Sequence, residues 1–279
     1  MLAIDIGNTH TVLGLYREGR LARKWRLTTR PTATSDEIEM RVRNLLDLGH
    51  FPVDALHCAV LATVVPSLDR TWRKALERIL PPEHVVSLSH ANCGFPVEYA
   101  NAAQIGPDRL ANALGVERLG LRDAIVIDLG TATTFDVVKE GRYLGGAIAP
   151  GIETGMLALT GRTARLPQVA IEVPSKATGR STETALHSGL LLGHVGMMEY
   201  LVARIRREEG MDAAAKVIAT GGWSQVLRGL TTVVNLYQTD LTLDGLEWFC
   251  RTRFEPPDPS RATVPEFAAG AFAKERPSE

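Results

Sequence analysis

Two short segments of the chain have the composition of phosphate-binding turns. The first reads Asp5-Ile6-Gly7-Asn8-Thr9 and the second Asp128-Leu129-Gly130-Thr131, each at the end of an apolar run that predicts a buried strand. A glycine lets the backbone come close to a ligand, and the N–H groups beside it can form a concavity that binds anions. An aspartate repels phosphate, but it can hold a metal ion that bridges phosphates. Two such turns facing one cleft would hold a polyphosphate from both sides.

The residues around these turns are repeated, which argues against two chance turns. One Asp-x-Gly segment alone would be interpreted as an ordinary turn. Residues 4–7 match residues 127–130, and residues 17–20 match residues 139–142, with a spacing that differs by one residue. This internal repeat predicts a domain duplication. The chain contains neither a Gly-Lys-Ser/Thr segment nor a G-x-G-x-x-G fingerprint, so neither turn is a Walker A loop or a dinucleotide-binding turn.

A third polar segment, Gly106-Pro107-Asp108-Arg109, has the residue order of a helix N-terminus. Proline suits the first helical turn, and the helix dipole favours an ionised Asp108 that can accept a proton. The planar fork of Arg109 suits a carboxylate. A kinase that acts on an alcohol also carrying a carboxylate needs both groups. The competing interpretation is a capping aspartate beside a surface ion pair, and the neighbouring motifs favour catalysis over it.

Together these motifs resemble the type III pantothenate kinase family, whose paired phosphate turns belong to the acetate-kinase/heat-shock-protein/actin superfold. The matching segments are residues 5–9, 106–112, 128–134, 145–151, 179–182 and 219–222, in family order, so that the match covers roughly residues 1 to 250. The resemblance implies ATP-dependent phosphorylation of pantothenate to 4'-phosphopantothenate, the first step of coenzyme A biosynthesis.

The resemblance also implies roles for individual residues. Asp108 would be the catalytic base for the pantothenate hydroxyl. Mg²⁺ would accompany ATP with Asp5 near it, and Asp128 would bind the monovalent cation, K⁺ or NH₄⁺, that the family requires. ATP contacts are expected at Asp5, Ile6, Gly7, Asn8, Thr9, His10, Thr11, Val12 and Thr131, and pantothenate contacts at Tyr99, Gly106, Pro107, Asp108, Arg109 and Thr182, the last across a homodimer interface.

Two positions depart from the family pattern. Pro107 stands where a small residue such as alanine is usual, and Ala102 stands where a proline often follows Tyr-x-Asn. Both bear on the shape of the pantothenate pocket and leave the acidic and phosphate-binding residues unchanged. His10 is interpreted as a loop residue rather than a catalyst, because phosphoryl transfer needs positioning and charge more than a second base.

The elements that would position these residues follow from hydrophobic periodicity. The first half predicts a three-stranded meander over residues 2–6, 11–16 and 21–28, helices over 35–49 and 66–80, and strands over 55–65 and 85–88. The second half predicts a meander over 124–128, 133–138 and 143–148, a strand over 216–220, and helices over 182–209, 224–230 and 243–254. The predicted fold class is α/β, with two tandem ribonuclease-H-like (actin-like ATPase) domains built on mixed sheets. They would span residues 1–115 and 116–255, followed by a flexible tail over 256–279.

Composition narrows the class of protein further. A length of 279 residues, 45% of them apolar and 23% charged, suits a soluble chain of two domains, and the net charge of -1 predicts no nucleic-acid partner. Three cysteines without short spacing argue against disulfides or a zinc site and fit the cytoplasm. We expect no signal peptide and no membrane span, which would need about 20 apolar residues. The apolar stripe over residues 182–209 is compatible with a homodimer interface, or with packing on its own sheet.

Two rival functions stay open at this point. The same family resembles the Bvg accessory factors, named for effects on transcription, although the near-neutral charge gives no DNA-binding footprint. The other rival is a different actin-like phosphotransferase, such as a sugar or acetate kinase, which the short chain and the segment over residues 106–109 disfavour.

Overall fold

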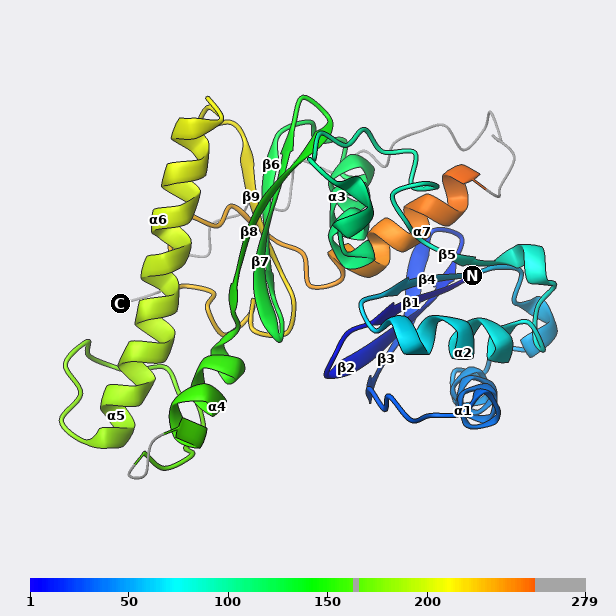
Figure 1. The fold of residues 1–279 in the computed structure, drawn as a ribbon, viewed down its shortest axis with the longest axis horizontal. Coiled ribbons are helices and arrows are strands. Elements are labelled where there is room, and N and C mark those ends of the chain that lie inside the picture. Colours follow the sequence, from blue (N-terminus) through cyan, green and yellow to red (C-terminus); the bar gives the residue numbers. More distant parts are fainter. Residues whose placement is uncertain (163–165, 254–279) are drawn as a thin grey trace, which may run out of the picture.

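The N-terminal half folds around a five-stranded mixed sheet (Figure 1). The structure, a computed structural model, describes residues 1–162 and 166–253. The predicted meander is antiparallel, and two further strands run parallel to β1. The sheet order is β3-β2-β1-β4-β5, with β1 at Leu2–Ile6, β2 at His10–Arg17, β3 at Arg20–Thr28, β4 at Ala59–Thr63 and β5 at Val85–Ser87. Parallel neighbours need crossover connections, and α1 (Ser35–Leu48) and α2 (Pro66–Leu76) supply them.

The second half repeats this sheet with the same strand order and directions. The order is β10-β9-β6-β7-β8, with β6 at Ala124–Leu129, β7 at Ala132–Lys139, β8 at Arg142–Pro150, β9 at Lys216–Thr220 and β10 at Leu236–Tyr237. The α/β fold of two tandem ribonuclease-H-like domains with mixed sheets is therefore confirmed.

Both halves also use the same hairpin turn. Glu18 and Gly19 have φ angles of 50° and 74°, and Glu140 and Gly141 have φ angles of 52° and 74°. Two consecutive positive φ values define a type I′ turn, whose twist matches that of paired strands. The β2–β3 and β7–β8 pairings each shift register once near this turn. The repeated Glu-Gly pair in the sequence thus marks the same local geometry twice.

Helices cover the outer faces of both sheets and fill the space between them (Figure 1). α1 and α2 cover the outside of the first sheet, and α6 (Gly193–Glu208) packs on the outside of the second. α3 (Pro107–Arg118) and α7 (Leu241–Arg253) lie between the sheets and pack against each other. α7 returns to contact β1, β2 and β4 of the first sheet. The domain boundary that we predict between residues 115 and 116 falls within α3.

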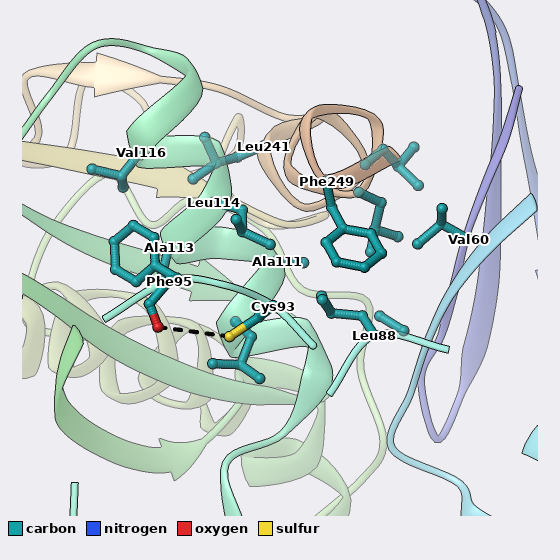
Figure 2. Packing of buried hydrophobic residues seen from close by; sticks show 14 of the residues in the cluster. Val60, Leu88, Cys93, Phe95, Ala111, Ala113, Leu114, Val116, Leu241 and Phe249 are labelled. Carbon is teal, nitrogen blue, oxygen red and sulfur yellow. Dashed lines mark hydrogen bonds between the residues drawn. The ribbon is translucent and has the colours of Figure 1, made fainter. Parts of the chain in front are cut away.

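One hydrophobic cluster joins the two halves (Figure 2). It contains Val60 of β4, Leu114 of α3 and Phe249 of α7, all buried. Val126 of β6 and Ile218 of β9 belong to the same cluster. Because close-packed cores resist changes in volume, this shared core fixes how the ends of the two sheets face each other.

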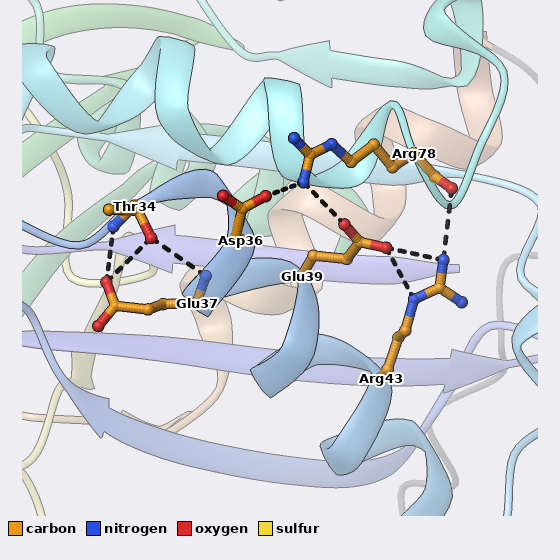
Figure 3. Close-up of polar contacts among 6 residues, drawn as sticks. All are labelled: Thr34, Asp36, Glu37, Glu39, Arg43 and Arg78. Atoms are coloured by element: carbon orange, nitrogen blue, oxygen red, sulfur yellow. Dashed lines mark hydrogen bonds and ion pairs between the residues drawn. The ribbon is translucent and has the colours of Figure 1, made fainter.

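The start of α1 is held by polar contacts at the surface (Figure 3). Thr34 and Glu37 form a capping box, in which the Glu37 carboxylate accepts the Thr34 N–H at 2.8 Å. Arg78, which follows α2, donates to Asp36 and to Glu39, the latter at 3.0 Å. These ion pairs are exposed and screened by water, so they orient α1 on α2 without deciding the fold.

Two predicted helices differ from the structure, and one helix of the structure was not predicted. The helix over residues 182–209 is divided into α5 (Thr182–His187), a π-helical turn (Ser188–Leu192) and α6. The helix over residues 224–230 is wrong, because successive turns stand there and Gly229 adopts a φ of 88° that a helix cannot accommodate. α4 (Ile152–Arg162) was not predicted.

Two sequence expectations concern the ends of the chain and membranes. The tail predicted over residues 256–279 lies outside the described residues. Within residues 1–162 and 166–253, no helix combines the length and apolar character that crossing a membrane requires.

Candidate active site

A cleft of about 650 Å³ lies where β1 and β6 run into the two predicted phosphate turns. Asp5, Asp108 and Asp128 all line it, so the two turns face one cleft as predicted. Its wall from the first half includes Gly7, Asn8, His10, Val12, Lys24, Arg26 and Val64, and its wall from the second half includes Leu129, Gly130, Thr131, Ala132, Thr134, Glu153, Thr220, Gly221, Gly222, Trp223 and Asp240.

Burial is the main cause that raises the pKa of all three aspartates of the cleft. Burial raises the pKa of Asp5 well above its ordinary value, and the charges of Asp108 and Asp128 raise it further. Burial, with the Asp108 charge beside it, raises the pKa of Asp128 to about 7. In the described part of the chain, no lysine or arginine forms an ion pair with any of the three. Such an anionic group favours a bound cation.

The described residues do not include three His, Cys, Asp or Glu side chains gathered as a complete metal site. A Mg²⁺ ion in a nucleotide site commonly takes one or two carboxylates and completes its shell with phosphate oxygens and water. Asp5, which is half-buried and lacks an ion pair with the described residues, is suited to that partial role.

The two phosphate turns touch each other at their tips. The hydroxyls of Thr9 and Thr131 lie 2.9 Å apart. Each turn is anchored from behind, because the Thr29 hydroxyl donates to the Gly7 carbonyl at 2.7 Å and the Gly151 N–H donates to the Thr131 carbonyl at 3.1 Å. These bonds hold the backbone N–H groups of both turns in a fixed arrangement beside the cleft.

The turn after β9 comes very close to Asp128. Gly221 has a φ of 84°, and a Cβ there would lie 2.5 Å from the Oδ1 atom of Asp128. Only glycine combines this backbone conformation with this approach. The glycine in the segment over residues 219–222 therefore lets this turn close the cleft around the Asp128 carboxylate.

Asp108 stands at the start of α3, as predicted. Gly106 is the N-cap and Pro107 is the first helical residue. The Asp108 carboxylate accepts the N–H of Arg109 at 2.9 Å. Burial outweighs this bond and raises the pKa of Asp108 to about 6. The helix N-terminus therefore does not keep this pKa low, although the group is still mostly ionised at neutral pH.

Arg109 is buried, with 6% of its surface exposed, so it does not form the surface ion pair of the competing interpretation. Its Nε donates to Asp136 at 2.6 Å, and its Nη2 donates to the Phe135 carbonyl at 3.0 Å. The guanidinium also lies 5.7 Å from the centre of the Tyr143 ring. The strands of the second sheet thus fix its orientation.

Asp136 is the buried acid that the sequence analysis missed. It accepts hydrogen bonds from Arg109, from Asn112 at 3.1 Å and from the Tyr143 hydroxyl at 3.1 Å. Asn112 also donates to Asp128 at 3.4 Å, which connects this network to the cleft. A signal was available, because a charged residue in the middle of an apolar strand needs a partner.

Several predicted contact residues do not line the cleft. Ile6 is buried in the first sheet's core, and the Thr11 hydroxyl bonds within the fold, because alternate strand residues face opposite sides. The ring centres of Tyr99 and Tyr143 lie 6.3 Å apart, and the Arg109 guanidinium lies beside the same Tyr143 ring. Thr182 is exposed at the start of α5.

Two basic side chains of β3, Lys24 and Arg26, do line the cleft, although the sequence analysis gave them no role. They are two residues apart on one strand and therefore point to the same face. The Lys24 ammonium pairs with Asp240 at 2.7 Å. The cleft thus carries positive as well as negative side chains.

Comparison with known proteins identifies close relatives. The family model for type III pantothenate kinase matches residues 1–204. The type III pantothenate kinase of Thermomicrobium roseum is 40% identical over 248 residues, covering 88% of this chain and 95% of that protein. That of Desulfosudis oleivorans is 38% identical over 251 residues, covering 88% and 96%. Among solved structures, a protein described as a Baf family transcriptional activator from Campylobacter jejuni aligns with a TM-score of 0.59 and 20% identity, covering 90% of this chain and 98% of that one, and so shares the fold.

Proposed function

The chain belongs to the type III pantothenate kinase family, and we propose that its reaction takes place in the cleft between the two sheets. The reaction is the phosphorylation of pantothenate by ATP to give 4'-phosphopantothenate, the first step of coenzyme A biosynthesis. One observation carries the assignment of the site: three aspartates, from β1, α3 and β6, converge between two phosphate-binding turns.

Asp108 is the proposed base that accepts the proton of the pantothenate hydroxyl. A base works best when its pKa lies near the working pH, and burial raises the pKa of Asp108 to about 6. The carboxylate lines the cleft and belongs to neither phosphate turn. It can therefore face an acceptor hydroxyl while the turns hold the nucleotide.

The backbones of residues 5–12 and Thr131 are the proposed ATP contacts. Asp5 would lie near the Mg²⁺ that accompanies the phosphates, and Asp128 would hold K⁺ or NH₄⁺; both are half-buried carboxylates without an ion pair among the described residues. When bound, these cations neutralise the charge of the phosphates. The protein's own part is orientation and electrostatic stabilisation, since phosphoryl transfer needs little covalent chemistry.

Tyr99, Arg109 and the residues at 106–108 are the proposed pantothenate contacts. Arg109 uses its Nε and one bond from its Nη2 for Asp136 and Phe135. A guanidinium has five N–H donors, and the others make no hydrogen bond within the described residues, so they can meet the pantothenate carboxylate. Asp136 would then act as a positioning residue that orients the Arg109 guanidinium.

We expect Arg109→Lys to raise the KM for pantothenate more than the KM for ATP. Lysine keeps the charge but loses the bidentate fork, and it cannot satisfy Asp136 and Phe135 together. Because Arg109 is buried, the thermal midpoint should fall as well. Steady-state kinetics with each substrate varied, beside a thermal melt, measure both effects. Equal changes in the two KM values would contradict the assignment of Arg109 to pantothenate.

A homodimer is the proposed assembly, with Thr182 reaching the partner's substrate site. Large apolar side chains are exposed on the second half, among them Ile148 of β8 (67% exposed), Leu157 of α4 and Tyr200 of α6. Exposed apolar groups of this kind mark interaction surfaces when they are contiguous. Light scattering during size exclusion should give twice the monomer mass, and Tyr200→Glu should reduce it. A monomeric parental protein would contradict the proposal.

The proposed location is the cytoplasm. The three cysteines have no short spacing in the sequence, which fits a reducing compartment better than a disulfide framework. Fractionation of cells that express the protein tests this, and recovery in a membrane or secreted fraction would contradict it.

One assay tests the function directly. ATP-dependent phosphorylation of pantothenate should occur with Mg²⁺ and potassium present, and sugars and acetate should not be phosphorylated under the same conditions. Transfer to a sugar or to acetate would indicate another phosphotransferase. No transfer to any acceptor would favour a regulatory protein with the same fold.

A further inference from the structure

The cleft contains one basic side chain whose charge is not matched by a carboxylate. Lys24 and Arg26 lie on the same face of β3, and Lys24 forms an ion pair with Asp240. Arg26 has no carboxylate within ion-pair distance among the described residues. Among the described residues, its side chain makes one hydrogen-bond contact, with His10, whose Nδ1 lies 3.2 Å from the Arg26 Nη2.

The Arg26 guanidinium reaches across the cleft from the first half to the second. A Cβ on Gly222 would lie 3.3 Å and 3.4 Å from its two Nη atoms, so the guanidinium rests against the turn after β9. Arg26 pairs with Val12 in the sheet, and both side chains line the cleft. The guanidinium therefore lies between the first phosphate turn and the Gly221-Gly222 turn.

His10 holds Arg26 in this position. Burial lowers the pKa of His10, and the nearby Arg26 charge lowers it further. A neutral imidazole can accept a hydrogen bond at one ring nitrogen, which suits a guanidinium donor. The nearby Glu153 carboxylate acts on the same pKa in the opposite direction, and it does not pair with Arg26.

Neither phosphate turn supplies a positive side chain of its own. Residues 5–12 and 128–134 contain no lysine or arginine, whereas kinases of other folds place a lysine on the phosphates. We infer that Arg26 binds the polyphosphate of the nucleotide, spanning the cleft from β3 to the turn at Gly222. This inference rests on the proposed function in assuming that the nucleotide occupies this cleft. Within the described residues several N–H donors of this guanidinium have no partner, and its fork matches phosphate oxygens.

A plainer role has to be weighed against this one. Charged residues on edge strands prevent unwanted strand pairing, and β3 is an edge strand. Arg23 fits that role, because it is exposed on the same strand and does not line the cleft. Arg23→Gln is therefore the matched control, since it removes the same charge from the same strand.

The test is calorimetric binding of ADP and of adenosine, both with Mg²⁺, to the full-length protein. Arg26→Gln should weaken ADP binding about tenfold or more, the loss expected for one charge-assisted bond to phosphate. Adenosine binding should stay unchanged, since adenosine has no phosphate. Arg26→Lys should recover part of the affinity for ADP, and Arg23→Gln should bind both ligands like the parental protein.

Parental affinity for ADP in Arg26→Gln would overturn the inference, as would an equal loss for adenosine. Kinetics give a second readout, in which the KM for ATP should rise in Arg26→Gln while the KM for pantothenate changes less than about twofold. Because ADP binding is measured without pantothenate, it separates this inference from the proposed function. If the parental protein binds ADP through Arg26 but does not phosphorylate pantothenate, only the substrate assignment fails.

Discussion

Replacing Asp108 with asparagine is expected to lower kcat about 10²–10⁴-fold, the usual contribution of a positioned base. Asparagine keeps the size of the side chain but cannot accept the hydroxyl proton. Asp108 belongs to neither phosphate turn, so ADP should still bind with nearly parental affinity. Steady-state kinetics and ADP titration on the same preparation measure the two quantities separately.

The pH dependence of the parental enzyme's rate should report the ionisation of Asp108. The base acts only when it is deprotonated, and the pKa of Asp108 is raised to about 6. The rate should therefore be nearly constant around pH 8 and fall as the pH drops through about 6. The residual activity of Asp108→Asn should not show this fall in rate near pH 6.

A matched control for this substitution stands at the start of another helix. Asp36→Asn makes the same change in the first turn of α1, outside the cleft, and should keep the parental rate and pH profile. If Asp108→Asn turned over pantothenate at the parental rate, the catalytic assignment would be wrong. The regulatory alternative would then gain support.

The sequence predicted those parts of the fold that depend on local geometry. The Glu-Gly pairs between the predicted strands are interpreted as turns, and both turns are present. The Asp-x-Gly segments predict strand ends facing a ligand, and Asp5 and Asp128 do line one cleft. Duplication strengthened both predictions, since each half supported the interpretation of the other.

The parts that could not be predicted depend on contacts between distant residues. Asp136 is buried because Arg109, 27 residues earlier in the chain, donates to it, and no local pattern shows that pairing. α7 carries the apolar residues of an ordinary amphipathic helix, and nothing in them indicates packing against the first sheet. Arg26 belongs to a basic edge strand, and only the tertiary structure sets it against Gly222.

Asp128→Asn is expected to remove activation by potassium and, without cations, to stabilise the folded protein at about pH 8. The pKa of Asp128 is raised to about 7 in the folded state, above its ordinary value in an unfolded chain of about 3.9. The folded state therefore binds this proton more tightly, and stability falls as the pH rises between these two values. Each pKa unit corresponds to about 1.4 kcal/mol, so the buried charge costs a few kcal/mol at most.

Asparagine removes that charge with little change in shape, so the thermal midpoint at about pH 8 should rise. The gain should shrink when potassium is added, because the cation stabilises only the protein that keeps its carboxylate. Asp36→Asn should act in the opposite direction, since the nearby Arg78 lowers the pKa of Asp36 and ionisation there favours folding. Thermal melts of the parental protein, Asp128→Asn and Asp36→Asn, with and without potassium, measure the changes in stability. Potassium titrations of activity measure the activation. An unchanged potassium titration in Asp128→Asn would place the monovalent cation elsewhere in the cleft.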